Sequence, residues 1–179
     1  KDHVDANSFR ELLQIPKNAK IITYTASAER VFPDEPEFIQ ALLSAIDDGV
    51  FGKAYMVLRI HPTERKSLYI SLYENCGLSI RLDIPDSGFA ASTQNGKIDV
   101  SGVDNFISLI LISDVIINLA STITLDAILF DKPVICPKFN LSLPKGNWNA
   151  AHQWYTSSHF IHITESGAVS MPEQMDELV

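Results

Sequence analysis

Two hydroxyl residues and a carboxylate, Ser121, Thr122 and Asp126, form the part of the sequence best suited to hold a ligand. They follow an apolar run and open a helical stretch, where unpaired N–H groups and the helix dipole favour a phosphate. Asp126 shares a helix face with Thr122, ~6 Å further along the axis. That is about the separation between a nucleotide's diphosphate and its ribose, whose hydroxyls a carboxylate can accept. In the alternative interpretation, Ser121 only caps the helix and Asp126 is a solvated acid.

Three more candidates lie in two other turns. His61 ends an apolar run, where its imidazole can donate a hydrogen bond to a phosphate. Arg30 follows the first apolar run, and arginine favours two-pronged phosphate contacts. Ser27, in the same turn, can donate through its hydroxyl or its backbone. The alternatives are that His61 caps the next helix and that Arg30 pairs with Glu29 or Asp34 on the surface.

Other kinds of site are excluded by the residues present. A nicotinamide site needs glycines in the first turn and an acid after the second strand, and residues 25–30 and 54–62 supply neither. The sequence holds no complete phosphate-binding loop, no Gly-x-Ser-x-Gly elbow and no His-x-x-x-His or Cys-x-x-Cys pair. No metal and no cofactor is therefore expected, and no catalytic residue is identified. Two cysteines provide no disulfide framework and favour a reducing compartment.

Alternating apolar runs and helical stripes position these candidates. A stripe from Phe38 to Ile46, preceded by Asp34 and Glu37 as a capping pair, predicts the first helix. Strand, helix, strand repeated in this way indicates an α/β domain with a parallel sheet. Strands are predicted at residues 21–25, 54–60, 78–82, 115–117, 134–136 and 160–163, and further helices at 65–75, 103–112 and 122–130.

The apolar character of each run predicts the order of the strands. Continuously apolar runs suit central strands that are covered on both faces. Residues 78–82 alternate with polar residues and His162 interrupts 160–163, so both are expected at the edges. This pattern predicts a Rossmann-like doubly wound sheet of about six strands in the order 3-2-1-4-5-6, which binds ligands at the switch point between strands one and four.

Length and charge limit the remaining possibilities. The 179 residues predict one domain, and the net charge of −8 argues against a nucleic-acid partner. The longest apolar stretch, 106–120, contains Asp114 and is too short to span a membrane. Residues 83–102, with a hairpin signal at Asn95 and Gly96, and residues 141–158 have no assigned role. A helix start near Pro172 stops at the last residue, so the chain is expected to be a fragment of a longer one.

The motifs together resemble a known family. His61-Pro62 and residues 113–117, 121–127 and 131–135 resemble the donor-binding, C-terminal domain of GT-B glycosyltransferases. The resemblance is greatest to the surface-polysaccharide, CDP-glycerol transferase and UDP-GlcNAc 2-epimerase-like branches, and it covers most of residues 21–178.

The resemblance implies a two-domain enzyme whose missing N-terminal half supplies the acceptor site and usually the general base. Catalysis in the family is typically independent of metal, and the nucleotide-linked donor is a substrate. Carried over by position, Ser121 and Thr122 contact phosphate and Asp126 takes the ribose-binding place, while His61 and the turn from Ser27 to Arg30 line the diphosphate.

The sequence also departs from the family at two places. It lacks the Gly-Gly pair that the epimerases carry before the helix, which argues against epimerase chemistry, and Asp131 stands where a glycine is usual.

The expected function is the donor-binding half of a glycosyl- or glycerophosphotransferase in surface polysaccharide biosynthesis, which takes a nucleotide sugar or CDP-glycerol. This chain alone is expected to be inactive. The full protein is expected in the cytoplasm, with any contact to the membrane made by the missing part. The alternatives are a non-catalytic nucleotide- or sugar-binding module and a UDP-GlcNAc 2-epimerase-like isomerase.

Overall fold

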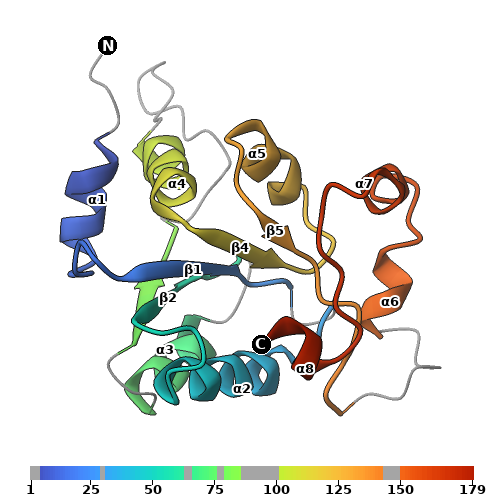
Figure 1. Cartoon of the computed structure of the whole chain (residues 1–179), viewed down its shortest axis with the longest axis horizontal. Coiled ribbons are helices and arrows are strands. Elements are labelled where there is room, and N and C mark those ends of the chain that lie inside the picture. The colour runs from blue at the N-terminus through green and yellow to red at the C-terminus, as the bar shows by residue number, and fades with distance from the viewer. Residues whose placement is uncertain (1–4, 29–30, 63–65, 76–78, 86–100, 143–149) are drawn as a thin grey trace.

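The protein is built around a single parallel sheet of five strands in the order β3-β2-β1-β4-β5 (Figure 1). The computed structural model describes residues 5–28, 31–62, 66–75, 79–85, 101–142 and 150–179. The predicted α/β class, the parallel pairing and the order of the first five strands are confirmed. The strands are β1 (Lys20–Thr25), β2 (Ala54–Arg59), β3 (Ile80–Asp83), β4 (Val115–Asn118) and β5 (Val134–Ile135).

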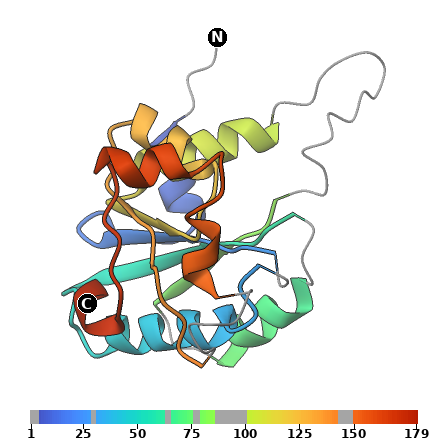
Figure 2. The same ribbon diagram turned by 90° about the vertical axis from the view of Figure 1, so that its right-hand side faces the viewer.

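Helices cover both faces of this sheet. Figures 1 and 2 show α2 and α3 on one face, and α1, α4 and α5 on the other. The three helices predicted after the first are confirmed as α3, α4 and α5, with boundaries within two residues of those expected. The helices are α1 (Ala6–Leu12), α2 (Glu35–Asp47), α3 (Lys66–Asn75), α4 (Ser101–Ile112), α5 (Ile123–Leu129), α6 (Ala151–Trp154), α7 (Ile161–Ser166) and α8 (Met175–Leu178).

The central strand β1 shows why its apolar run is continuous. Ile21 packs on the face of α1 and α4 with Phe9 and Leu109, while Ile22 belongs to the larger core that contains Phe38 of α2. Successive side chains of a strand point to opposite faces, so a strand covered on both sides favours apolar residues on both faces. Burial of the α2 stripe from Phe38 to Ile46 completes that second face.

The sixth predicted strand is wrong. Residues 160–163 begin helix α7, because the spacing of Phe160 and Ile163, which are both buried, also fits one face of a helix. The place beside β5 is taken by Ser170, which forms an isolated parallel bridge with Ile135. The amide of Cys136 donates to the carbonyl of Ser170 at 2.8 Å, so the sheet ends in one bridged residue instead of a strand.

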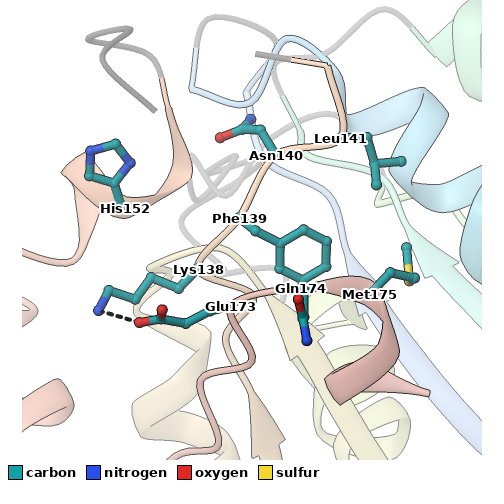
Figure 3. Close-up of a pocket in the computed structure, with 8 residues that line it drawn as sticks. All are labelled: Lys138, Phe139, Asn140, Leu141, His152, Glu173, Gln174 and Met175. Atoms are coloured by element: carbon teal, nitrogen blue, oxygen red, sulfur yellow. Dashed lines mark hydrogen bonds and ion pairs between the residues drawn. The ribbon is translucent and has the colours of Figure 1, made fainter. Parts of the chain in front are cut away.

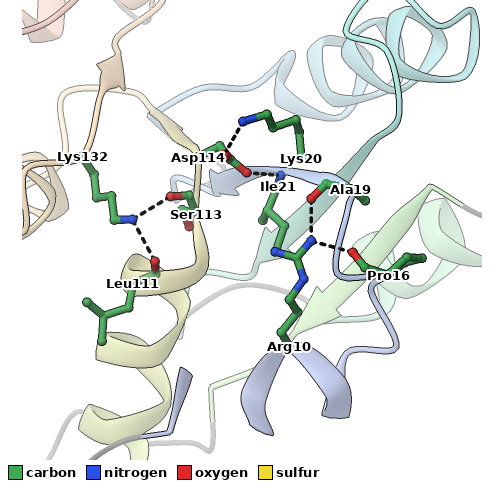
Figure 4. Close-up of polar contacts among 9 residues, drawn as sticks. All are labelled: Arg10, Pro16, Ala19, Lys20, Ile21, Leu111, Ser113, Asp114 and Lys132. Atoms are coloured by element: carbon green, nitrogen blue, oxygen red, sulfur yellow. Dashed lines mark hydrogen bonds and ion pairs between the residues drawn. The ribbon is translucent and has the colours of Figure 1, made fainter. Parts of the chain in front are cut away.

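Polar contacts close the amino edge of the sheet (Figure 4). Lys20 forms an ion pair with Asp114 at 2.9 Å, and the other carboxylate oxygen of Asp114 accepts from the amide of Ile21. Burial alone would raise the pKa of Asp114, but these two donors together lower it. Arg10 donates to carbonyls of the α1–β1 connection, and Lys132 donates to carbonyls at the end of α4. These polar groups at the amino edge are therefore engaged within the protein.

The two segments to which the sequence assigned no role, 83–102 and 141–158, lie partly outside the described residues. Residues 86–100, including the predicted turn at Asn95 and Gly96, and residues 143–149 lie outside the described residues. The described part of 141–158 contains the short helix α6, which was not predicted. Within the described residues, no helix combines the length and apolar character needed to cross a bilayer.

Candidate functional site

A cavity of about 400 Å³ opens at the carboxyl edge of the sheet, where β1 lies between β2 and β4. This is the predicted switch point. The strand ends are in register here, because Thr25 of β1 pairs with both Arg59 of β2 and Asn118 of β4. The lining residues are Thr25, Ala26, Arg59, Ile60, His61, Pro62, Phe106, Ser121, Thr122, Ile123 and Asp126.

Four of the six candidate residues from the sequence line this cavity: His61, Ser121, Thr122 and Asp126. The roles proposed for them remain predictions. Ser27 is not among the lining residues but follows Ala26, which is. Arg30 lies outside the described residues.

Most backbone N–H groups of the turn between β4 and α5 donate hydrogen bonds to acceptors in the same segment. The side-chain oxygen of Asn118 accepts from the amide of Ser121 at 3.1 Å, and the hydroxyl of Ser121 accepts from Ile123 at 3.3 Å. The N-cap position of α5 is Thr122, whose side chain makes no capping bond, so the Ser121 hydroxyl oxygen accepts from the first turn of the helix in its place. The amide of Thr124 donates to the carbonyl of Ser121. The amide of Thr122 has no hydrogen-bond partner in the part of the chain that the structure describes, so the turn offers fewer open donors than expected.

The two places where the sequence departs from the family have unusual backbone conformations. Ala120, just before the turn, has a φ of 43°, and Asp131, just after α5, has a φ of 56°. Both values lie in the left-handed region that favours glycine. The chain therefore adopts this backbone conformation at both positions without glycine.

Asp126 is partly exposed on the first turn of α5. Within the described residues, no hydrogen bond or ion pair engages its carboxylate. An acid in this state is available to a ligand. His61, on the opposite wall of the cavity, is also partly exposed and has an interaction within the protein.

Arg59 is a lining residue that the sequence did not single out. It is only 6% exposed, forms an ion pair with Asp83 of β3, and lies over the Phe106 ring with 4.8 Å between the guanidinium carbon and the ring centroid. Burial raises the pKa of Asp83, although Arg59 opposes that rise. The pair joins β2, β3 and α4 into one wall of the cavity, and its positive charge is balanced inside the protein.

Glu35, the first residue of α2, binds the turn after β1 through hydrogen bonds. Its carboxylate accepts hydrogen bonds from the Tyr24 hydroxyl at 3.0 Å, the Ser27 amide at 2.8 Å and the Tyr69 hydroxyl at 2.8 Å. Burial raises the pKa of Glu35 to about 7. The sequence did not indicate this role, because nothing local distinguishes Glu35 from the other acids around it.

Asp34 has a different role from the one predicted. It occupies the N-cap position of α2, but its side chain makes no capping bond. Instead, the buried carboxylate accepts from the side-chain amide of Asn140 at 2.6 Å and from the backbone amides of Leu141 and Ser142. Asp34 therefore ties α2 to the segment after β5, which the predicted pairing with Glu37 would not do.

A second cavity of about 430 Å³ lies beside this segment and the start of α8 (Figure 3). Phe139 lies at its centre, and an ion pair at 3.1 Å joins Lys138 to Glu173 (Figure 3). His152 of α6 stands on another side. None of the candidate residues from the sequence lines this cavity, so the cavity at the switch point is the stronger candidate site. The described residues contain no group of three His, Cys, Asp or Glu that could hold a metal ion.

Comparison with known proteins agrees with this architecture. No family model and no curated protein sequence matches the chain. Among solved structures, S. aureus MnaA in its UDP co-structure has a TM-score of 0.58 at 16% identity over 95% of this chain. UDP-GlcNAc 2-epimerase from Neisseria meningitidis bound to UDP-GlcNAc has a TM-score of 0.58 at 15% identity over 92%. The glycosyl transferase family 9 protein from Veillonella parvula has a TM-score of 0.57 at 12% identity over 97%.

These similarities concern the fold. The chain has the fold of a GT-B glycosyltransferase-like domain, as the sequence resemblance predicted. It spans 36–40% of the length of these three solved chains.

Proposed function

We propose that this chain is the donor-binding half of a glycosyl- or glycerophosphotransferase. The donor, a nucleoside diphosphate linked to a sugar or to glycerol, binds in the cavity between β1, β2 and the β4–α5 turn. One observation carries this proposal: His61, Ser121, Thr122 and Asp126, chosen from the sequence for their chemistry, line a single cavity at the switch point of the sheet. The UDP and UDP-GlcNAc bound to two proteins of similar fold support it.

The lining residues suit the parts of such a donor. The amide and hydroxyl of Thr122 and the hydroxyl of Ser121 donate hydrogen bonds to phosphate oxygens. His61 donates from the opposite wall. The free carboxylate of Asp126 accepts from the ribose hydroxyls. Hydrogen-bond donors held in fixed positions stabilise the negative charge that builds up on the diphosphate as it leaves.

A missing N-terminal half completes the enzyme in this proposal. It supplies the acceptor site and the general base, since this chain offers no convincing base of its own. The short coverage of the solved chains supports a second domain. The proposed setting is surface polysaccharide biosynthesis in the cytoplasm, with contact to the membrane made by the missing half.

A second candidate is a UDP-GlcNAc 2-epimerase-like isomerase. It is supported by the similarity to the N. meningitidis epimerase, whose TM-score equals that of MnaA. The absence of the Gly-Gly pair before α5 weighs against it, although Ala120 adopts the backbone conformation that glycine favours.

A binding panel tests the proposed function. The purified chain is titrated with UDP, CDP, GDP, UDP-GlcNAc and CDP-glycerol while its thermal unfolding is followed. A ligand present at one hundred times its Kd stabilises the folded state by about 2.7 kcal/mol, which raises the Tm measurably. At least one nucleoside diphosphate is expected to do so, and the absence of any shift across the panel would contradict the proposal.

A further inference from the structure

Thr25 is the last residue of β1 and forms part of the cavity lining. Its side chain is almost completely buried, since the residue is only 4% exposed. Its hydroxyl has no hydrogen-bond partner among the residues that the structure describes. Burying a hydroxyl without a partner costs free energy, and native proteins rarely accept that cost unless water or a ligand completes the bond.

Thr23, two residues earlier on the same strand, shows the usual arrangement. It is 1% exposed, and its hydroxyl lies 2.6 Å from that of Ser113. Ser113 gives its own proton to the carbonyl of Leu109, so Thr23 is the donor in the pair. The two threonines share a strand and a face, and both are buried. They differ in that Thr25 is a lining residue of the cavity and its hydroxyl lacks a partner among the described residues.

The surroundings of Thr25 favour an acceptor group as its partner. The amide of Thr122, across the cavity, is a second donor without a partner in the described residues. The Arg59 guanidinium beside Thr25 is engaged by Asp83. Two open donors facing one space suit an oxygen that only accepts hydrogen bonds, and phosphate oxygens are of this kind.

We propose that the Thr25 hydroxyl donates a hydrogen bond to a phosphate oxygen of the nucleotide at the floor of the cavity. This inference rests on the proposed function, which it extends by one specific contact. It makes Thr25 a phosphate-binding residue whose hydroxyl destabilises the empty protein and strengthens binding. Removing the hydroxyl should therefore change stability and affinity in opposite directions.

Three variants test this inference. Thr25→Val keeps the shape and removes the hydroxyl, Thr25→Ser keeps the hydroxyl, and Thr23→Val removes a satisfied hydroxyl on the same strand. The affinity of each is measured by calorimetry with the nucleoside diphosphate that binds the wild type most tightly among UDP, CDP and GDP. Binding of the matching nucleoside, which has no phosphate, is followed by NMR. Stability is measured by urea unfolding without ligand.

Thr25→Val is expected to weaken diphosphate binding about tenfold. It should leave nucleoside binding unchanged and raise the urea midpoint. Thr25→Ser should bind within about twofold of the wild type, since one hydroxyl replaces another. Thr23→Val should lower the urea midpoint, because Ser113 loses its donor, and should leave the Kd unchanged.

The possible failures are distinguishable. Undiminished diphosphate binding by Thr25→Val would overturn this inference while leaving the proposed function intact. An equal loss for nucleoside and diphosphate would overturn it too, because Thr25 would then contact the base or ribose. A wild type that binds no nucleoside diphosphate would overturn both the proposed function and this inference.

Discussion

At the scale of single residues, the most specific claim concerns the free carboxylate of Asp126. If it accepts ribose hydroxyls, Asp126→Ala removes charge-assisted hydrogen bonds worth about 1.5–3 kcal/mol each, so the Kd for the nucleotide should rise at least tenfold. The free energy of unfolding should change by less than about 1 kcal/mol, because a partly exposed acid in the first turn contributes only through the helix dipole. Calorimetry and urea unfolding measure the two effects.

Asp104 provides a matched control for this variant. It is an exposed acid in the first turn of α4 and does not line the cavity, so Asp104→Ala should leave the Kd unchanged. A 2′,3′-dideoxy nucleotide should bind the wild type more weakly than the ordinary nucleotide does. The Asp126→Ala variant should bind the two nucleotides with about the same affinity. If Asp126→Ala loses equal affinity for both nucleotides, Asp126 does not contact the ribose.

Residue chemistry explains which site residues the sequence could reveal. Asp126 and His61 could be expected near one cavity from the sequence, because each follows a predicted strand whose carboxyl end lies at the switch point, and both line the cavity. Thr25 and Arg59 were not, because their significance depends on burial and partners from other strands. Glu35 was missed for the same reason, since its three donors come from β1, the following turn and α3.

At the scale of elements, the start of α2 gives the protein a predictable pH dependence. The pKa of Glu35 rises from an ordinary 4.5 to about 7 in the folded state, so the folded protein holds this proton more tightly than the unfolded chain. The resulting stability is fully present below pH 4.5 and is lost as the pH rises towards 7. Glu35→Gln stays neutral and keeps an acceptor oxygen for Tyr24 and the Ser27 amide. Relative to the wild type, this variant should gain about 2–3 kcal/mol between pH 5 and pH 8.

Urea unfolding at both pH values measures this gain. Glu37→Gln is the control, because Glu37 lies in the same first turn of α2 but is exposed. Its difference from the wild type should be the same at pH 5 and pH 8. A parallel pH dependence in Glu35→Gln and the wild type would show that Glu35 does not titrate in this range.

The end of α5 permits a second test at this scale. Asp131 has a φ of 56°, so Asp131→Gly relieves a left-handed conformation and should stabilise the protein by about 0.5–1 kcal/mol. Asp48 ends α2 with a φ of −71°, where glycine offers no such relief. Asp48→Gly should therefore destabilise the protein, because glycine adds freedom to the unfolded chain. Destabilisation by Asp131→Gly in urea unfolding would contradict this explanation of the turn.

The elements themselves were largely predictable from periodicity. The five confirmed strands are continuous or alternating apolar runs, and α2 to α5 carry apolar stripes. The run at 160–163 was misassigned, because four residues with apolar ends fit both a strand and one helical turn. The short helices α6 and α7 span six residues or fewer, which leaves too little repeat to detect. Helix α1, of seven residues, was also not predicted.

At the scale of the whole molecule, the two edges of the sheet differ in whether their polar groups have partners within the described residues. At the amino edge, Lys20 forms an ion pair with Asp114. Arg10 and Lys132 donate hydrogen bonds to backbone carbonyls there. At the carboxyl edge, three groups of cavity-lining residues have no partner in the described residues: the Thr25 hydroxyl, the Thr122 amide and the Asp126 carboxylate. Doubly wound sheets bind ligands at this edge because their chain reversals leave a crevice there.

The most direct test of the central claim is an NMR map of the chain's amide signals during titration with the best-binding nucleoside diphosphate. The account predicts that the largest chemical-shift changes fall on residues 25–27, His61 and residues 121–126, which surround the cavity at the switch point. Changes centred on Lys20 and Asp114, or on the second cavity around Phe139, would contradict it.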